Sequence, residues 1–143
     1  MEAEVRVSLV KEDYIIDGKI DLIRSPEKNA DDDVVEIIDF KSEKKPDSAR
    51  ETEKINRYKK QLQVYAYLVE QNTGKKVSKL HLYYTGEEHD IPTISFTPSK
   101  AEIKETIAEF DQTVRKIQNR DFEHKSTSDR ICENCDFRFY CRR

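Results

Sequence analysis

Two carboxylates and a lysine stand where strand pairing would bring them together. Asp39 and Lys41 are two residues apart in the β-branched segment 34–41, so on a strand both side chains project from the same face. Asp21 lies in an earlier β-rich segment, 14–23, and pairing of the two strands would set it beside Asp39. Facing carboxylates repel each other unless a cation lies between them. Oxygen ligands of this kind bind Mg²⁺ or Mn²⁺.

A lysine beside such a cation has a use in phosphodiester hydrolysis. It can orient or help to deprotonate the attacking water, or neutralise the charge that grows on the phosphate. The side chain of Phe40 points to the other face of the strand, but its backbone carbonyl is a further candidate metal ligand. The alternative is that Asp39 and Lys41 lie at an exposed strand end and are merely solvated.

A glutamine interrupts the apolar stripe of the helix that should follow this strand. The stripe comprises Ile55, Tyr58, Leu62, Tyr65, Leu68 and Val69. Gln61 falls within it, and a buried amide destabilises a fold unless it is hydrogen-bonded, so we expect Gln61 to bond a partner. Tyr65, one turn later, is on the same face. The alternative is a satisfied glutamine at the boundary of the core, beside a core tyrosine.

The hydrophobic period predicts the elements that must position these side chains. In chain order they are strands near 5–9, 14–23 and 34–41, a helix from about 53 to 71 or 72, strands 79–85 and 91–96, and a helix over about 99–117. The first two strands should form a hairpin. Gly74 should end the first helix, and a Ser99/Glu102 capping box should begin the second. This order predicts an α/β fold, with helices packed on a mixed sheet.

Three short segments resemble the motifs of a known family. They are Gly18-Lys19-Ile20-Asp21, Ile37-Ile38-Asp39-Phe40-Lys41 and Gln61-Leu62-Gln63-Val64-Tyr65. In this order they resemble the GxxD, (D/E)xK and QxxxY motifs of the RecB-like branch of PD-(D/E)XK nucleases. The resemblance extends from about Glu4, a looser match to an acidic position on the family's first strand, to Cys141.

The resemblance implies a restriction-endonuclease-like fold, which is a mixed β-sheet flanked by helices. It implies Mg²⁺ or Mn²⁺ on Asp21 and Asp39, and Lys41 as the catalytic lysine. It gives Gln61 and Tyr65 roles in organising the site or contacting DNA.

Three cysteines near the end of the chain suggest a second metal centre. Cys132, Cys135 and Cys141 form a C-x₂-C-x₅-C pattern, and soft sulfur ligands select Zn²⁺ or an iron–sulfur cluster. A four-coordinate site needs one more ligand, and His124 is a local candidate for zinc. The tail also resembles that of iron–sulfur, AddB-like members, whose fourth cysteine lies far upstream. This resemblance implies that the chain is a fragment lacking an N-terminal helix, with a [4Fe–4S] cluster in the full-length parent.

Length and composition limit the domain organisation. The chain has 143 residues, about one domain, with 36% hydrophobic residues. We expect a nuclease core over 1–123 and a cysteine tail of the same domain over 124–143. No run approaches the roughly 18 apolar residues that a membrane helix needs, and the N-terminus does not resemble a signal peptide. The expected location is therefore the cytoplasm.

The distribution of charge favours DNA as a partner. The net charge is −3, but residues 41–60 carry eight basic and four acidic side chains. Within this segment Lys44, Lys45, Arg57 and Lys60 are the candidate phosphate contacts, and three later arginines (Arg138, Arg142 and Arg143) could extend the patch. No feature suggests base-specific recognition, so the predicted contact is independent of DNA sequence.

Together with the family resemblance, these observations predict a metal-dependent DNase domain, and the resemblance implies the exonuclease module of a DNA-repair helicase–nuclease. The chain has no GxxxxGK[ST] pattern, so an ATPase motor would lie elsewhere in the parent chain or in a partner subunit. A stand-alone CRISPR-type exonuclease of the same family is one alternative. A non-catalytic, zinc-binding interaction module is another, and in that case the acidic pair would have no catalytic role.

Overall fold

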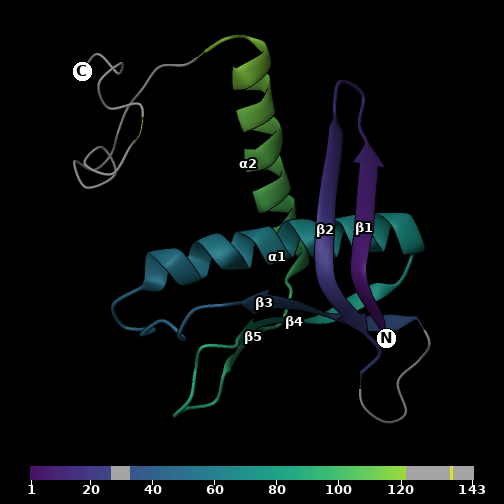
Figure 1. Ribbon diagram of the computed structural model, residues 1–143. Coiled ribbons are helices and arrows are strands. Elements are labelled where there is room, and N and C mark those ends of the chain that lie inside the picture. The colour runs from purple at the N-terminus through teal and green to yellow at the C-terminus, as the bar shows by residue number, and fades with distance from the viewer. Residues whose placement is uncertain (27–32, 122–135, 137–143) are drawn as a thin grey trace. The chain divides into compact units, whose positions relative to one another are not determined.

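A five-stranded mixed sheet forms the centre of the first part of the chain (Figure 1). The computed structural model describes residues 1–26, 33–121 and 136. These residues belong to two units, 1–108 and 109–143, with the boundary inside the second helix. In chain order the strands are β1 (Glu2–Val10), β2 (Ile15–Arg24), β3 (Val34–Lys41), β4 (Lys76–Tyr84) and β5 (Thr93–Phe96). Their order in the sheet is also β1-β2-β3-β4-β5.

The strand directions follow from the connections. β1 and β2 form the predicted antiparallel hairpin, and β2 pairs antiparallel with β3. β3 and β4 are parallel, because helix α1 (Thr52–Thr73) carries the chain back across the sheet between them. β5 is antiparallel to β4. The prediction of an α/β fold with a mixed sheet is therefore confirmed.

Helix α1 covers one face of this sheet (Figure 1). It ends at Gly74, whose φ of 71° is left-handed and whose N–H donates to the carbonyl of Glu70, as the sequence predicts. The side chains that α1 buries are Ile55, Leu62, Gln63, Ala66, Leu68 and Val69. Of these, Leu62, Ala66, Leu68 and Val69 share one core cluster with apolar residues of β2, β3 and β4, among them Ile20, Ile37 and Leu82.

Helix α2 (Lys100–Gln118) contributes Ile103 and Ile107 to the same core. Its first turn differs from the expected capping box. The carboxylate of Glu102 faces α1, where it accepts hydrogen bonds from Lys59 (2.8 Å) and Gln63 (3.3 Å). This acidic side chain therefore ties the two helices together.

The later strands differ from the sequence-based bounds. β4 begins three residues earlier than expected, because Lys76 N–H donates to the carbonyl of Asp33 and so starts the parallel ladder with β3. β5 begins two residues later, after the exposed Ile91. Within the described ranges, no helix is both long enough and apolar enough to span a membrane.

Candidate active site

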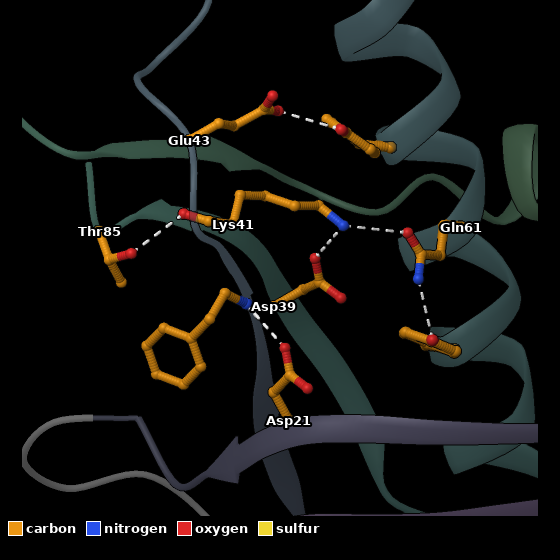
Figure 2. Close-up of polar contacts among 9 residues, drawn as sticks. Asp21, Asp39, Lys41, Glu43, Gln61 and Thr85 are labelled. Atoms are coloured by element: carbon orange, nitrogen blue, oxygen red, sulfur yellow. Dashed lines mark hydrogen bonds and ion pairs between the residues drawn. The ribbon is translucent and has the colours of Figure 1, made fainter. Parts of the chain in front are cut away.

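Asp39 and Lys41 form an ion pair at the end of β3. Their side chains project from the same face of the strand, and Lys41 Nζ lies 2.6 Å from Asp39 Oδ2 (Figure 2). Asp39 is only 5% exposed, because α1 covers this face of the sheet. The alternative of a solvated strand end is therefore wrong for this pair.

Asp21 lies opposite Asp39 at a point where the sheet loses its regular pairing. The β2–β3 ladder ends at Leu22 and Ile38, and the next pair in register is Asp21 with Asp39. At this position the Asp21 carboxylate accepts a hydrogen bond from the backbone N–H of Phe40, with a length of 2.8 Å (Figure 2). The side chain thus takes a hydrogen bond that a strand backbone would otherwise accept, which holds it beside Asp39.

Two residues next to this acidic pair, Phe40 and Glu4, have their side chains engaged in other contacts. The ring of Phe40 lies on the opposite face, edge-on to Tyr83 with the centroids 5.7 Å apart, so only its backbone is near the site. Glu4 occupies the β1 position opposite Asp21 and has a positive φ of 54°. Its exposed carboxylate forms an ion pair with Lys19 at 3.0 Å.

The electrostatics at Asp39 suit a bound cation. Burial raises the pKa of Asp39, the hydrogen bond and charge of Lys41 oppose that rise, and the negative charge of Asp21 adds to it. A divalent cation between the carboxylates would offset both the burial and the repulsion, so the residues fit Mg²⁺ or Mn²⁺. In the described part of the chain, no group of three or more His, Cys, Asp or Glu side chains is gathered to hold a metal. Such a cation would therefore rely on two carboxylates, backbone oxygen and water.

Gln61 connects Lys41 to Tyr65. Lys41 Nζ donates to Gln61 Oε1 at 3.3 Å (Figure 2). Gln61 Nε2 in turn donates to the Tyr65 hydroxyl at 2.9 Å. The expectation that Gln61 bonds a partner and shares a face with Tyr65 is confirmed. The ring of Tyr65 packs on the backbone of β2 at Gly18, where an added Cβ would lie only 3.0 Å from Tyr65 Cε1. The three sequence motifs thus meet in one contact chain.

Sequence reasoning missed a second set of residues beside Lys41. The Lys41 ammonium lies 4.1 Å from the centre of the Tyr58 ring, and the Tyr58 hydroxyl donates to Glu43 (3.0 Å). Glu43 also accepts from Lys54 at 2.6 Å. From the sequence, Tyr58 is recognisable only as a member of the apolar stripe of the helix. Its spacing of three residues from Gln61, which places both on one helix face, was the available signal.

Tyr84 brings a further hydroxyl close to this region. It is the register partner of Lys41 on β4, and its side chain is fully buried. Burial raises the pKa of Tyr84 to about 12, with a smaller contribution from the charge of Glu43. Its hydroxyl has no hydrogen-bond partner among the described residues.

The candidate DNA contacts differ in whether their charged groups already form ion pairs within the protein. Lys44 and Arg57 are exposed and form no ion pair with a described residue, and Lys60 is exposed as well. Lys45 instead contacts Asp90 (2.5 Å) and the carbonyl of Ile91 (2.8 Å). Its charge therefore stabilises the loop before β5, which the sequence did not predict.

The second predicted metal centre cannot be placed. Cys132, Cys135, Cys141 and the zinc candidate His124 lie outside the described residues. The same holds for the three arginines expected to extend the basic patch, Arg138, Arg142 and Arg143.

Comparison with known proteins agrees with this geometry. Residues 1–142 match the family described as the PD-(D/E)XK nuclease superfamily. The fold is similar to the crystal structure of a protein from Eubacterium rectale described as a "Putative exonuclease", with a TM-score of 0.58 and 18% sequence identity. That match covers 99% of this chain and 52% of the other, so the chain spans about half the length of that relative. A search of curated proteins found no match.

The domain is thus an α/β domain whose mixed sheet carries Asp39 and Lys41 at the end of its central strand, β3, with Asp21 opposite them on the neighbouring strand, β2. The chain belongs to the PD-(D/E)XK nuclease superfamily. Its restriction-endonuclease-like fold, predicted from the three motifs, is confirmed.

Proposed function

We propose that this chain is a metal-dependent deoxyribonuclease domain that hydrolyses phosphodiester bonds, acting as an exonuclease. The observation that carries the proposal is the buried Asp39–Lys41 ion pair with Asp21 held opposite it. The family supports a nuclease, and the arrangement supplies two carboxylates for a cation and one cationic side chain beside them.

Each residue has a distinct part in the proposed reaction. Asp21 and Asp39 would hold Mg²⁺ or Mn²⁺, with the Phe40 carbonyl as a further ligand. The chemistry that such a cation would supply is polarisation of a phosphoryl oxygen and stabilisation of the negative charge that develops there. Lys41 orients the attacking water or neutralises charge on the phosphate, and Gln61 accepts from its ammonium to direct it. Tyr65 in turn accepts a hydrogen bond from Gln61 and so restricts the orientation of its amide.

The substrate is DNA, bound through its phosphates and without sequence preference. Lys44, Arg57 and Lys60 follow the site in sequence and are exposed, which suits contact with a backbone. Lys45 is a weaker candidate for a phosphate contact, because its ammonium is paired with Asp90.

The parent protein is proposed to be an AddB-like helicase–nuclease of the RecB-like branch, with its motor elsewhere. The proposed domain comprises a core over 1–123 and a cysteine tail over 124–143. In the parent, Cys132, Cys135 and Cys141 would hold a [4Fe–4S] cluster with an upstream cysteine, and zinc is the alternative. Metal analysis of the purified parent, by iron and zinc content, distinguishes the two.

An Mg²⁺-dependent assay on single-stranded DNA tests the catalytic assignment. We expect Asp39→Asn and Lys41→Ala to lower the rate by at least 100-fold, on the order of the contribution of one electrostatic or acid–base group. Asp17→Asn is the matched control, because Asp17 is an exposed carboxylate on β2 that bonds only Ser8 among the described residues. Wild-type activity that is indifferent to both substitutions would overturn the assignment of Asp39 and Lys41 to the catalytic site.

Metal binding has a readout that does not depend on activity. Mg²⁺ should raise the melting temperature of wild type, since a ligand of the native state stabilises by about 2.7 kcal/mol at 100 times its Kd. Asp39→Asn should abolish this shift, and Asp17→Asn should keep it. A shift that survives in Asp39→Asn would place the cation elsewhere.

A further inference from the structure

We propose that Tyr58 is a positioning residue, whose ring face holds the Lys41 ammonium beside the acidic pair, and that Glu43 fixes Tyr58 in that position. The inference deepens the proposed function and rests on it, because it concerns how the proposed catalytic lysine is kept in place. Neither Tyr58 nor Glu43 belongs to the three motifs that define the site.

The contact is short for an interaction between a lysine and an aromatic ring. Lys41 Nζ lies 4.1 Å from the centroid of the Tyr58 ring, well inside the limit of about 6 Å for a cation–π contact. Other lysine–ring approaches in the described ranges, such as Lys59 to Phe96, are 5.7–5.8 Å. The side chain of Lys41 is 15% exposed, so water screens the contact little.

The ring of Tyr58 is fixed in position by a hydrogen bond from its hydroxyl to a carboxylate. The Tyr58 hydroxyl donates to Glu43 Oε1 (3.0 Å), and Lys54 Nζ lies 2.6 Å from Glu43 Oε2. The pKa of Glu43 is held below its ordinary value, chiefly by a hydrogen bond from Lys54 and to a smaller extent by the one from Tyr58. A phenol that donates to a carboxylate is richer in electrons, which strengthens its attraction for a cation. Figure 2 shows Glu43 just beyond Lys41, where the chain leaves β3.

The ring contact does not depend on the acidic pair. Among the described residues, the Lys41 ammonium contacts Asp39 Oδ2, Gln61 Oε1 and the Tyr58 ring. A divalent cation on Asp39 would weaken the attraction of that carboxylate for the ammonium and would itself repel the ammonium. Tyr58 and Gln61 are not candidate ligands, so their contacts can hold Lys41 near the phosphate when the cation is bound.

A nuclear magnetic resonance measurement on the full chain tests the contact without using activity. The ε-methylene protons of Lys41, assigned by their loss in Lys41→Arg, should be shifted upfield by the ring current of Tyr58. The shift should be reduced in Tyr58→Phe, which keeps the ring but loses the hydrogen bond to Glu43, and should disappear in Tyr58→Leu. Tyr67→Leu is the matched control, since Tyr67 is on the same helix and its ring faces Lys11 instead. An unshifted Lys41 resonance in wild type, or one unchanged in Tyr58→Leu, would overturn the proposal.

Kinetic measurements then distinguish a role of Tyr58 in positioning Lys41 from a role in stabilising the fold. In variants whose thermal unfolding matches that of wild type, Tyr58→Leu should lower kcat about tenfold with little change in KM. Tyr58→Phe should give a kcat between those of wild type and Tyr58→Leu, because the ring remains without its hydrogen bond to Glu43, and Tyr67→Leu should retain all of kcat. A normal kcat in Tyr58→Leu would overturn the positioning role. Full activity in Lys41→Ala would instead refute the proposed function, whatever the resonance shows.

Discussion

The ring of Tyr65 lies so close to Gly18 that a methyl group at residue 18 would come 3.0 Å from Tyr65 Cε1. The same methyl group would be 3.5 Å from Leu68 Cδ1. The absence of a side chain on β2 therefore allows α1 to approach the sheet with Tyr65 turned toward Gln61. Through Gln61 this packing contact reaches Lys41, so Gly18 on β2 and the proposed catalytic lysine on β3 are mechanically connected.

Gly18→Ala should displace Tyr65 and disturb the site. We expect a loss of about 1–3 kcal/mol in the free energy of unfolding, typical of overpacking, measured by urea denaturation. Nuclease activity should fall as well. Gly74→Ala is the control, because residue 74 has φ of 71° and an added Cβ there meets no atom within 4 Å. It should cost about 1–2 kcal/mol through backbone strain and leave the activity of the folded protein unchanged. Equal activity losses in both variants would contradict this mechanical connection.

Two glutamines on α1 should give opposite results when replaced by leucine. Gln63 is 4% exposed and accepts from the Thr106 hydroxyl (2.7 Å), so Gln63→Leu leaves a buried hydroxyl unpaired. We expect it to lower the free energy of unfolding by about 1–3 kcal/mol while activity per folded molecule is kept. Gln61→Leu should do the reverse, with a small change in stability and a large fall in kcat. Denaturation curves and initial rates on the same preparations decide between these outcomes.

His81 should make the stability of the fold depend on pH. Burial lowers the pKa of His81, and the nearby Glu36 carboxylate opposes this shift. The folded state then binds fewer protons than the unfolded state, whose histidine titrates near about 6.5. Stability is therefore full above about pH 6.5 and is lost as the pH falls toward the folded pKa, by at most about 1.4 kcal/mol per pH unit for this group.

The contribution of His81 can be isolated by substitution. His81→Gln should remove this part of the decline in stability between about pH 6.5 and the folded pKa. His89→Gln, at an exposed position, should keep it. Unfolding free energies from urea denaturation at several pH values provide the comparison. A decline that is identical in wild type and His81→Gln would rule out His81 as its source.

The basic residues near the site should differ in their contribution to DNA affinity. Lys44→Ala and Arg57→Ala should each weaken binding of single-stranded DNA and reduce the slope of log K against log salt by about 0.7. Lys45→Ala should change the slope less, because its ammonium is already paired with Asp90. Titrations by fluorescence anisotropy at several salt concentrations, with EDTA to prevent cleavage, give the slopes. A larger effect at Lys45 than at Lys44 would contradict this order.

The sequence by itself predicted the elements and the members of the main contact chain. The run of β-branched residues predicted the bounds of β3, and the 3.6-residue period with Gly74 predicted the end of α1, because both signals are local in the chain. The three motifs indicated Asp21, Asp39, Lys41, Gln61 and Tyr65, which the fold brings together. The start of β4 was missed, because a hydrogen bond from Lys76 to Asp33, distant in sequence, determines it.

Only the tertiary structure decided how the residues pair. The register of β2 against β3 sets Asp21 opposite Asp39, and the seating of α1 on the sheet brings Tyr58 over Lys41. The sequence predicted Lys45 as a phosphate contact, but in the fold the loop before β5 places the Asp90 carboxylate beside its ammonium. Periodicity determines which face of an element a side chain occupies, because it follows from backbone geometry. The partner it meets there depends on long-range packing, which no local pattern encodes.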